Sequence, residues 1–171
     1  MKRIGLGFLA VAGLLVFVFS QSAFAGGKPV LNITQHFDDE TETFNDVDPC
    51  TGAPAQITIV FDGVFHLVVQ SDGVGHFTET EVGTFAFDYL DENGNPDGQI
   101  DATGRFTEWD GGNGLFDEEG NPIGKAEFTF TLNGKGTRLA TGESFSFHAL
   151  AHATFDQLGN PKVAFEKAHC V

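Results

Sequence analysis

The sequence is poor in several residue types, and each shortage excludes a class of protein. Among 171 residues there are only two cysteines, one tryptophan and one tyrosine, and 9 lysines and arginines stand against 24 aspartates and glutamates. The formal net charge of -15 repels nucleic-acid phosphates and anionic membranes, so we expect neither as a partner. The motifs of a phosphate-binding loop, a dinucleotide-binding turn and a G-x-S-x-G nucleophile turn are also absent from the sequence.

Long apolar runs are missing everywhere except at the start of the chain. Lys2 and Arg3 precede an apolar run over 4–19, and the small residues Ala23 and Ala25 follow at the two positions that a signal peptidase reads. This order is typical of a Sec signal peptide, which predicts cleavage after residues 1–25 and export to the extracellular space, or to the periplasm of a Gram-negative cell. An uncleaved anchor is the alternative. No later run is apolar for about 18 residues, so we expect no membrane span in the mature chain.

The two cysteines, Cys50 and Cys170, lie near opposite ends of the mature chain. An even cysteine count in an exported protein predicts one disulfide, which would join the end of the last strand to the region before the first long strand. Two free thiols or a two-cysteine metal site are the alternatives. The disulfide interpretation is favoured because cysteines so far apart lack the spacing of metal ligands.

Apolar residues recur with a period of two, and no window shows a convincing helical period. The segments 126–132 and 145–155 alternate most clearly. The string D-x-x-G-N-P occurs three times, at 91–96, 117–122 and 156–161. Gly supplies a positive φ, Asp accepts hydrogen bonds from the loop backbone, and Pro tolerates the start of a strand. The repeat therefore predicts β-turns that join antiparallel strands.

The pattern predicts an all-β fold, an antiparallel up-and-down meander closing into a barrel of about eight strands. A β-sandwich is the alternative. We expect residues 26–55, an N-terminal strand followed by an acidic loop over 38–55, to form one domain with the main barrel over 56–171. A second loop is expected over 109–122. The predicted strands cover 30–37, 56–70, 74–90, 98–108, 123–132, 137–141, 144–155 and 162–170.

An acid-rich segment over 88–119 contains part of a calcium-binding pattern. Oxygen-bearing residues occupy the first, third, fifth and ninth places of the loop, with Gly98 at the sixth; they are Asn93, Asn95, Asp97 and Asp101. The twelfth place is Gly104, where such loops need a bidentate Glu. A weak calcium site is therefore one hypothesis and a plain hairpin loop the alternative. We expect no other cofactor.

Four histidines are candidates for ligand binding: His66, His76, His148 and His152. A three-residue loop over 71–73 predicts that His66 pairs with Thr78 and His76 with Val68, on the opposite face from Phe65 and Phe77. Histidine-bearing faces that converge inside a barrel would suit zinc binding or proton transfer. The alternative is that these faces are polar and solvated and that the histidines are ordinary.

Short motifs resemble a group of small exported bacterial all-β proteins of unknown function with one disulfide between the chain ends. They are Asp48-Pro-Cys50-Thr-Gly52, the histidine-bearing hairpin over 64–80, and the ending that runs from Phe147 to Cys170. The architecture also resembles calycin and allene-oxide-cyclase-like barrels. The resemblance implies a barrel and no particular activity.

Three function classes remain. Nineteen phenylalanines favour a dry interior, so the leading hypothesis is a secreted barrel that binds a small apolar ligand in a Phe-lined interior. The second is a structural or surface interaction protein with a filled core. The third is a cyclase- or isomerase-like enzyme that uses histidines and carboxylates; it would need His66 or His76 beside Glu79 or Glu81, which the predicted register places on the other face. The sequence favours a non-enzymatic role and predicts no oligomeric state.

Overall fold

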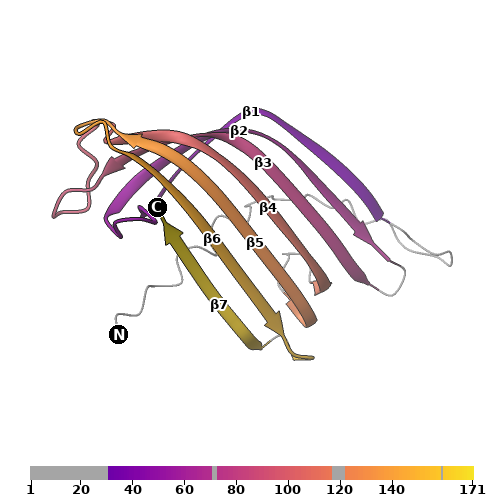
Figure 1. The fold of residues 1–171 in the computed structure, drawn as a ribbon. Helices are drawn as coiled ribbons and strands as arrows, with labels where there is room; N and C mark the ends of the chain where they lie inside the picture. The colour runs from indigo at the N-terminus through magenta and orange to yellow at the C-terminus, as the bar shows by residue number, and fades with distance from the viewer. Residues whose placement is uncertain (1–30, 71–72, 117–121, 159) are drawn as a thin grey trace.

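The chain forms one curved, seven-stranded antiparallel sheet in a computed structural model that describes residues 31–70, 73–116, 122–158 and 160–171 (Figure 1). Each strand pairs with the next along the chain, so the predicted up-and-down meander is confirmed. In the described part of the chain no ladder joins the first strand to the last, and the sheet is open there. The strands are β1 (Leu31–Val47), β2 (Pro54–Val69), β3 (Val74–Tyr89), β4 (Ala102–Phe116), β5 (Pro122–Arg138), β6 (Ser144–Phe155) and β7 (Pro161–Cys170).

Several strand boundaries differ from those predicted. β1 continues past residue 37 through an irregularity at Asp39, whose φ is 52°, and β4 continues through the Gly-rich residues 109–116. The expected strand over 137–141 is instead the end of β5 and a turn, in which the Arg138 N–H donates to the Glu143 carbonyl. Seven strands are therefore described where about eight were predicted. The predicted signal peptide lies outside the described residues.

One face of the sheet, here called the inner face, carries the hydrophobic core. The buried cluster consists of residues on the same face of four strands, β2, β3, β4 and β6: Ala55, Ile57, Ile59, Phe61, Phe85, Phe87, Ala102, Phe106, Phe145 and Phe147. The ring centroid of Phe85 on β3 lies 5.8 Å from that of Phe147 on β6, with the two rings tilted, although two strands lie between them. The rings reach each other because Gly104 and Gly134 have no side chains; a Cβ at Gly134 would lie 2.1 Å from Phe147. Glycines on the middle strands thus let phenylalanines from both sides cover the sheet.

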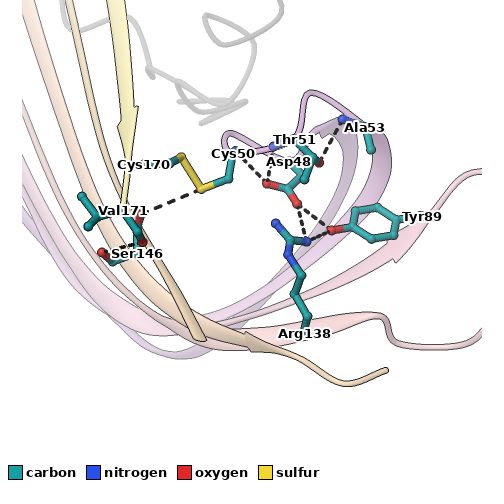
Figure 2. Close-up of a disulfide and its surroundings, with 9 residues drawn as sticks. All are labelled: Asp48, Cys50, Thr51, Ala53, Tyr89, Arg138, Ser146, Cys170 and Val171. Atoms are coloured by element: carbon teal, nitrogen blue, oxygen red, sulfur yellow. Dashed lines mark hydrogen bonds and ion pairs between the residues drawn. A yellow bond between two sulfur atoms is a disulfide. The ribbon is translucent and has the colours of Figure 1, made fainter. Parts of the chain in front are cut away.

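The predicted disulfide between Cys50 and Cys170 is confirmed, and it ties the β1–β2 loop to the end of β7 (Figure 2). Beside it, the Asp48 side chain is fully buried and accepts hydrogen bonds from Tyr89 Oη at 2.5 Å and from Arg138 Nη1 at 2.9 Å. Burial alone would raise the pKa of Asp48, but these bonds and one from the Cys50 N–H lower it. The disulfide and the hydrogen bonds of Asp48 with Tyr89 and Arg138, together called the knot, fasten the two ends of the meander. The disulfide agrees with an oxidising compartment.

The turn interpretation of the D-x-x-G-N-P repeat is confirmed where it is described. Asp91 Oδ1 accepts hydrogen bonds from the N–H groups of Asn93 and Asn95, and Gly94 has a φ of 81°. Asp156 Oδ1 accepts in the same way from the N–H groups of Leu158 and Asn160. The middle copy, at 117–121, lies outside the described residues.

Candidate functional site

The two central strands β3 and β4 carry the same pattern of residues on the inner face. β3 reads Phe77-Thr-Glu-Thr-Glu-Val-Gly83, and β4 reads Phe106-Thr-Glu-Trp-Asp-Gly-Gly112. Because the strands are antiparallel and in register, each Phe pairs with the Gly of the other strand, and the acids pair with each other. The result is a square of four inward carboxyl groups, here called the carboxyl quartet: Glu79 opposite Asp110, and Glu81 opposite Glu108.

Phenylalanine rings flank the carboxyl quartet at both ends. A Cβ at Gly112 would lie 2.6 Å from the Phe77 ring, and a Cβ at Gly83 would lie 2.9 Å from the Phe106 ring. Each ring therefore lies over the glycine of the neighbouring strand, a packing in which an aromatic side chain covers backbone that glycine leaves bare. The acids thus stand in an apolar frame that excludes much of the surrounding water.

The pKa values of the carboxyl quartet are all raised, chiefly by burial. Burial and the neighbouring carboxyl groups raise the pKa of Glu108 to about 9 and that of Glu81 to about 8. Burial and the charge of Glu79 raise the pKa of Asp110 to about 7. Burial and the charge of Glu42, on β1, raise the pKa of Glu79. At neutral pH the quartet therefore holds protons that ordinary carboxyl groups would have released.

Charge balance at the carboxyl quartet is incomplete. No lysine or arginine is among the groups that shift these four pKa values. The Oδ1 atom of Asp110 is buried and, among the described residues, has no hydrogen-bond partner. Such an acceptor is costly to bury unless it is satisfied. The described histidines, cysteines and acids include no group of three or more placed to hold a metal ion.

The histidines lie on the outer face, the face opposite the core. His66 pairs with Thr78 and His76 with Val68, which confirms the predicted register. Three of the four candidates contact polar side chains: His66 Nε2 is 2.9 Å from Asn32 Oδ1, His148 Nδ1 is 2.7 Å from Asn133 Oδ1, and His152 Nδ1 is 3.0 Å from Thr129 Oγ1. The structure does not bring these histidines together with the carboxyl quartet, because the sheet lies between them.

The predicted calcium ligands take part in hydrogen bonds within the loop between β3 and β4. Asp97 Oδ1 accepts a hydrogen bond from the Gln99 N–H, and Asp101 Oδ2 accepts one from the Tyr89 N–H. Asn93 and Asn95 donate their backbone N–H groups to Asp91. This arrangement is that of a hairpin loop built from turn-forming residues.

Our sequence reasoning missed the carboxyl quartet, although a signal was present. The sequence pattern places Glu108 and Asp110 in an acid-rich segment, and it offers Glu79 and Glu81 only as partners of His66 or His76 in the enzyme hypothesis. The signal is the spacing of the acids: in both strands they follow the phenylalanine, Phe77 or Phe106, by two and four residues. Side chains two residues apart on a strand share a face, so the acids lie on the core face with the phenylalanines. An acid at an inward position is unusual enough to mark a site.

Two open hollows lie away from the carboxyl quartet. One, of about 710 Å³, is at the ends of β5 and β6 beside Lys125, Phe155 and Lys162. The other, of about 400 Å³, is beside Val60 and Arg105.

Among the described residues no helix is long and apolar enough to cross a membrane. No family model, curated protein or solved structure matches this chain, so the resemblance to calycin-like barrels gains no support from comparison.

Proposed function

We propose that the inner face binds a small organic cation with an apolar body. The observation that carries the proposal is the carboxyl quartet itself: four acids meet among phenylalanines, and in the described part of the chain no lysine or arginine is among the groups that shift their pKa values. A site with this charge and this frame is complementary to an ammonium group attached to an apolar chain or ring. The proposal adds a cationic group to the apolar ligand that the sequence predicts.

The electrostatic balance favours such a ligand even though the acids hold protons. Releasing the proton of Glu81, whose pKa is raised to about 8, costs on the order of 1 kcal/mol at pH 7. An ion pair at about 4 Å in a partly buried site returns about 4 kcal/mol before desolvation is subtracted. Binding of a cation is therefore expected to displace a proton, which a neutral ligand would not do.

The apolar frame can accommodate the rest of the ligand. Phe77 lies 6.2 Å from Phe65 and 5.8 Å from Phe128, so aromatic rings extend from the carboxyl quartet along the inner face in both directions across the sheet. A cation above a ring gains about 0.5–2 kcal/mol in addition to its ion pair. The formal net charge of -15 also raises the local concentration of cations and excludes anions.

Isothermal titration calorimetry with three matched probes tests the proposal. Phenethylammonium, 2-phenylethanol and 3-phenylpropionate share an apolar body and differ in charge. Titrations at pH 7 in buffers of different ionisation enthalpy measure the protons released on binding. We expect the ammonium probe to bind with release of about one proton, and the alcohol and the carboxylate to bind at least about tenfold more weakly, a difference of about 1.4 kcal/mol.

Variants connect that result to the site. The double variant Glu81→Gln/Glu108→Gln should lose proton release and most of the affinity, because both side chains become permanently neutral. Glu143→Gln, in the exposed β5–β6 turn, is the matched control and should behave like the wild type. Equal binding of the alcohol and the ammonium probe, or binding that survives the double substitution, would refute the proposal.

A further inference from the structure

The outer face presents the single tryptophan of the chain to solvent. Trp109 is 44% exposed, and it lies on β4 between the inward-facing Glu108 and Asp110. Its indole lies over Gly111, two residues further along the strand: a Cβ there would lie 2.7 Å from Trp109 Cη2. Gly111 is buried as a result. The indole therefore covers the Gly111 backbone while part of its surface stays open to solvent, which leaves aromatic area for stacking.

Polar side chains continue outward from this platform along one row of the sheet. Gly111 pairs with Thr78 on β3 and with Thr129 on β5. Thr78 in turn pairs with His66, and Thr129 pairs with His152. All of these residues face the outer side, so the row reads His, Thr, indole, Thr, His across five neighbouring strands. With strands about 4.8 Å apart, the row spans about 19 Å.

The histidines at both ends of the row are held by neighbouring polar groups. His152 Nδ1 lies 3.0 Å from Thr129 Oγ1, and His66 Nε2 lies 2.9 Å from Asn32 Oδ1. These contacts fix the orientation of each imidazole. The row therefore offers oriented hydroxyl and imidazole groups on either side of an aromatic surface.

The row itself contains no carboxylate. At one end of it, Glu127 Oε1 lies 3.9 Å from His152 Nε2. The residues that pair with Trp109 on the two neighbouring strands are Thr80 and Thr131, which are also uncharged. Such a surface lacks the charge to select an ion and has the mixture of one aromatic ring and many hydrogen-bonding groups that suits a neutral polyhydroxylated ligand.

We propose that this row, centred on Trp109, binds a neutral oligosaccharide. The C–H bonds on one face of a sugar ring carry slight positive charge and stack on the negative face of the indole, while the hydroxyl groups at the ring edge bond to Thr78, Thr129 and the histidines. The row is several strands long, so it accommodates a chain of sugars and not a single one. This site lies on the opposite face from the carboxyl quartet and does not depend on the ligand proposed there.

Intrinsic fluorescence provides a direct test, because Trp109 is the only tryptophan. The purified protein is titrated with cellohexaose, chitohexaose and maltohexaose, which differ in linkage and substituents but are all neutral. We expect at least one to change the Trp109 emission in a saturable way. Calorimetry with the same sugar then compares the variants. Trp109→Ala should weaken binding at least about tenfold, about 1.4 kcal/mol, and Trp109→Phe should retain part of it.

A pair of histidine variants on one strand separates the row from the rest of the outer face. His152→Ala should weaken binding several-fold. His148→Ala is the matched control, since it lies on the same strand and face but outside the row, and should have no effect. The proposal is overturned if none of the three sugars gives a saturable change, or if binding survives Trp109→Ala. It is overturned equally if sedimentation shows that the sugar-free protein self-associates through Trp109, because the patch would then be an interface between copies.

Discussion

Replacing Glu108 by Gln is expected to stabilise the protein, and increasingly so as the pH rises. In the folded chain burial and neighbouring carboxyl groups raise the pKa of Glu108 to about 9 from a value of 4.5. Below pH 4.5 both the folded and the unfolded chain hold the proton, so the ionisation of Glu108 does not change the free energy of unfolding. Above it the unfolded chain releases the proton while the folded chain retains it, so stability is lost continuously until the pH reaches about 9.

The size of this stabilisation follows from the difference between the pKa of Glu108 in the folded chain and its pKa in the unfolded chain. Each pH unit between them costs about 1.4 kcal/mol, so at pH 7 the accumulated loss is about 3 kcal/mol. Gln has the same shape, carries no proton to lose and can still donate a hydrogen bond to Asp110. Relative to the wild type, Glu108→Gln should therefore gain little at pH 4.5 and up to about 3 kcal/mol at pH 7. For a domain of this size that gain corresponds to roughly 6–12 °C in Tm.

Urea unfolding followed by circular dichroism at pH 5, 6, 7 and 8 measures this difference, and Glu92→Gln in the exposed β3–β4 turn is the control. The control should match the wild type at every pH. The reasoning fails if Glu108→Gln differs from the wild type by the same amount at pH 5 and pH 8, since Glu108 would then be ionised in the folded protein. It also fails if the stability advantage of the variant over the wild type shrinks as the pH rises.

Three further substitutions test the remainder of the fold by the same unfolding measurement. Removing the disulfide with Cys50→Ala/Cys170→Ala opens a loop of 120 residues and should cost up to about 5 kcal/mol, whereas the oxidised wild type treated with reductant and re-oxidised should recover. Arg138→Met leaves the fully buried Asp48 without its cation and should cost about 3–5 kcal/mol; a cost under about 1 kcal/mol would mean that the knot is dispensable. Gly134→Ala places a Cβ 2.1 Å from a phenylalanine ring of β6 and should cost about 1–3 kcal/mol, and a stabilised variant would contradict the packing described.

The sequence was sufficient to predict the meander, because its evidence is local. Alternation identifies strands one at a time, and the three-residue loop over 71–73 sets the register of β2 against β3, which the pairing of His66 with Thr78 confirms. The disulfide followed from compartment and cysteine count. None of these inferences needs knowledge of which residues meet across non-neighbouring strands.

The boundaries of β1 and β4 were predicted wrongly for two different physical reasons. The acidic residues 38–42 were interpreted as loop, but an edge strand has one solvated side and tolerates charges, and Asp39 adopts a positive φ within it. The glycines over 111–114 were interpreted as loop, but they lie in a central strand where aromatic rings from neighbours occupy the missing side-chain volume. Composition alone cannot distinguish a glycine that bends the chain from one that a ring covers.

The carboxyl quartet could not be predicted without pairing β3 to β4. Each strand by itself shows two acids at alternate positions, which is common on a solvated face. Only the register that places Glu79 opposite Asp110 and Glu81 opposite Glu108 makes them one cluster. That register depends on the long β3–β4 connection, whose loop length does not fix the pairing as a tight hairpin does.

Three consecutive residues of β4 serve the two proposed sites: Glu108 and Asp110 face the inner side, and Trp109 faces the outer side. Only the alternation of side chains along the strand keeps the two sites apart. A slip of one residue would turn Trp109 into the core and both acids to the outside. The β3–β4 ladder is continuous from Val74 to Phe87, as are the β2–β3 and β5–β6 ladders, whereas irregularities interrupt the β1–β2, β4–β5 and β6–β7 ladders. The ladder in which a slip would abolish both sites is therefore one of the unbroken ones. Retaining ionisable groups in a core that apolar residues would stabilise is a cost that selection for folding alone does not explain, and ligand binding at the carboxyl quartet would explain it.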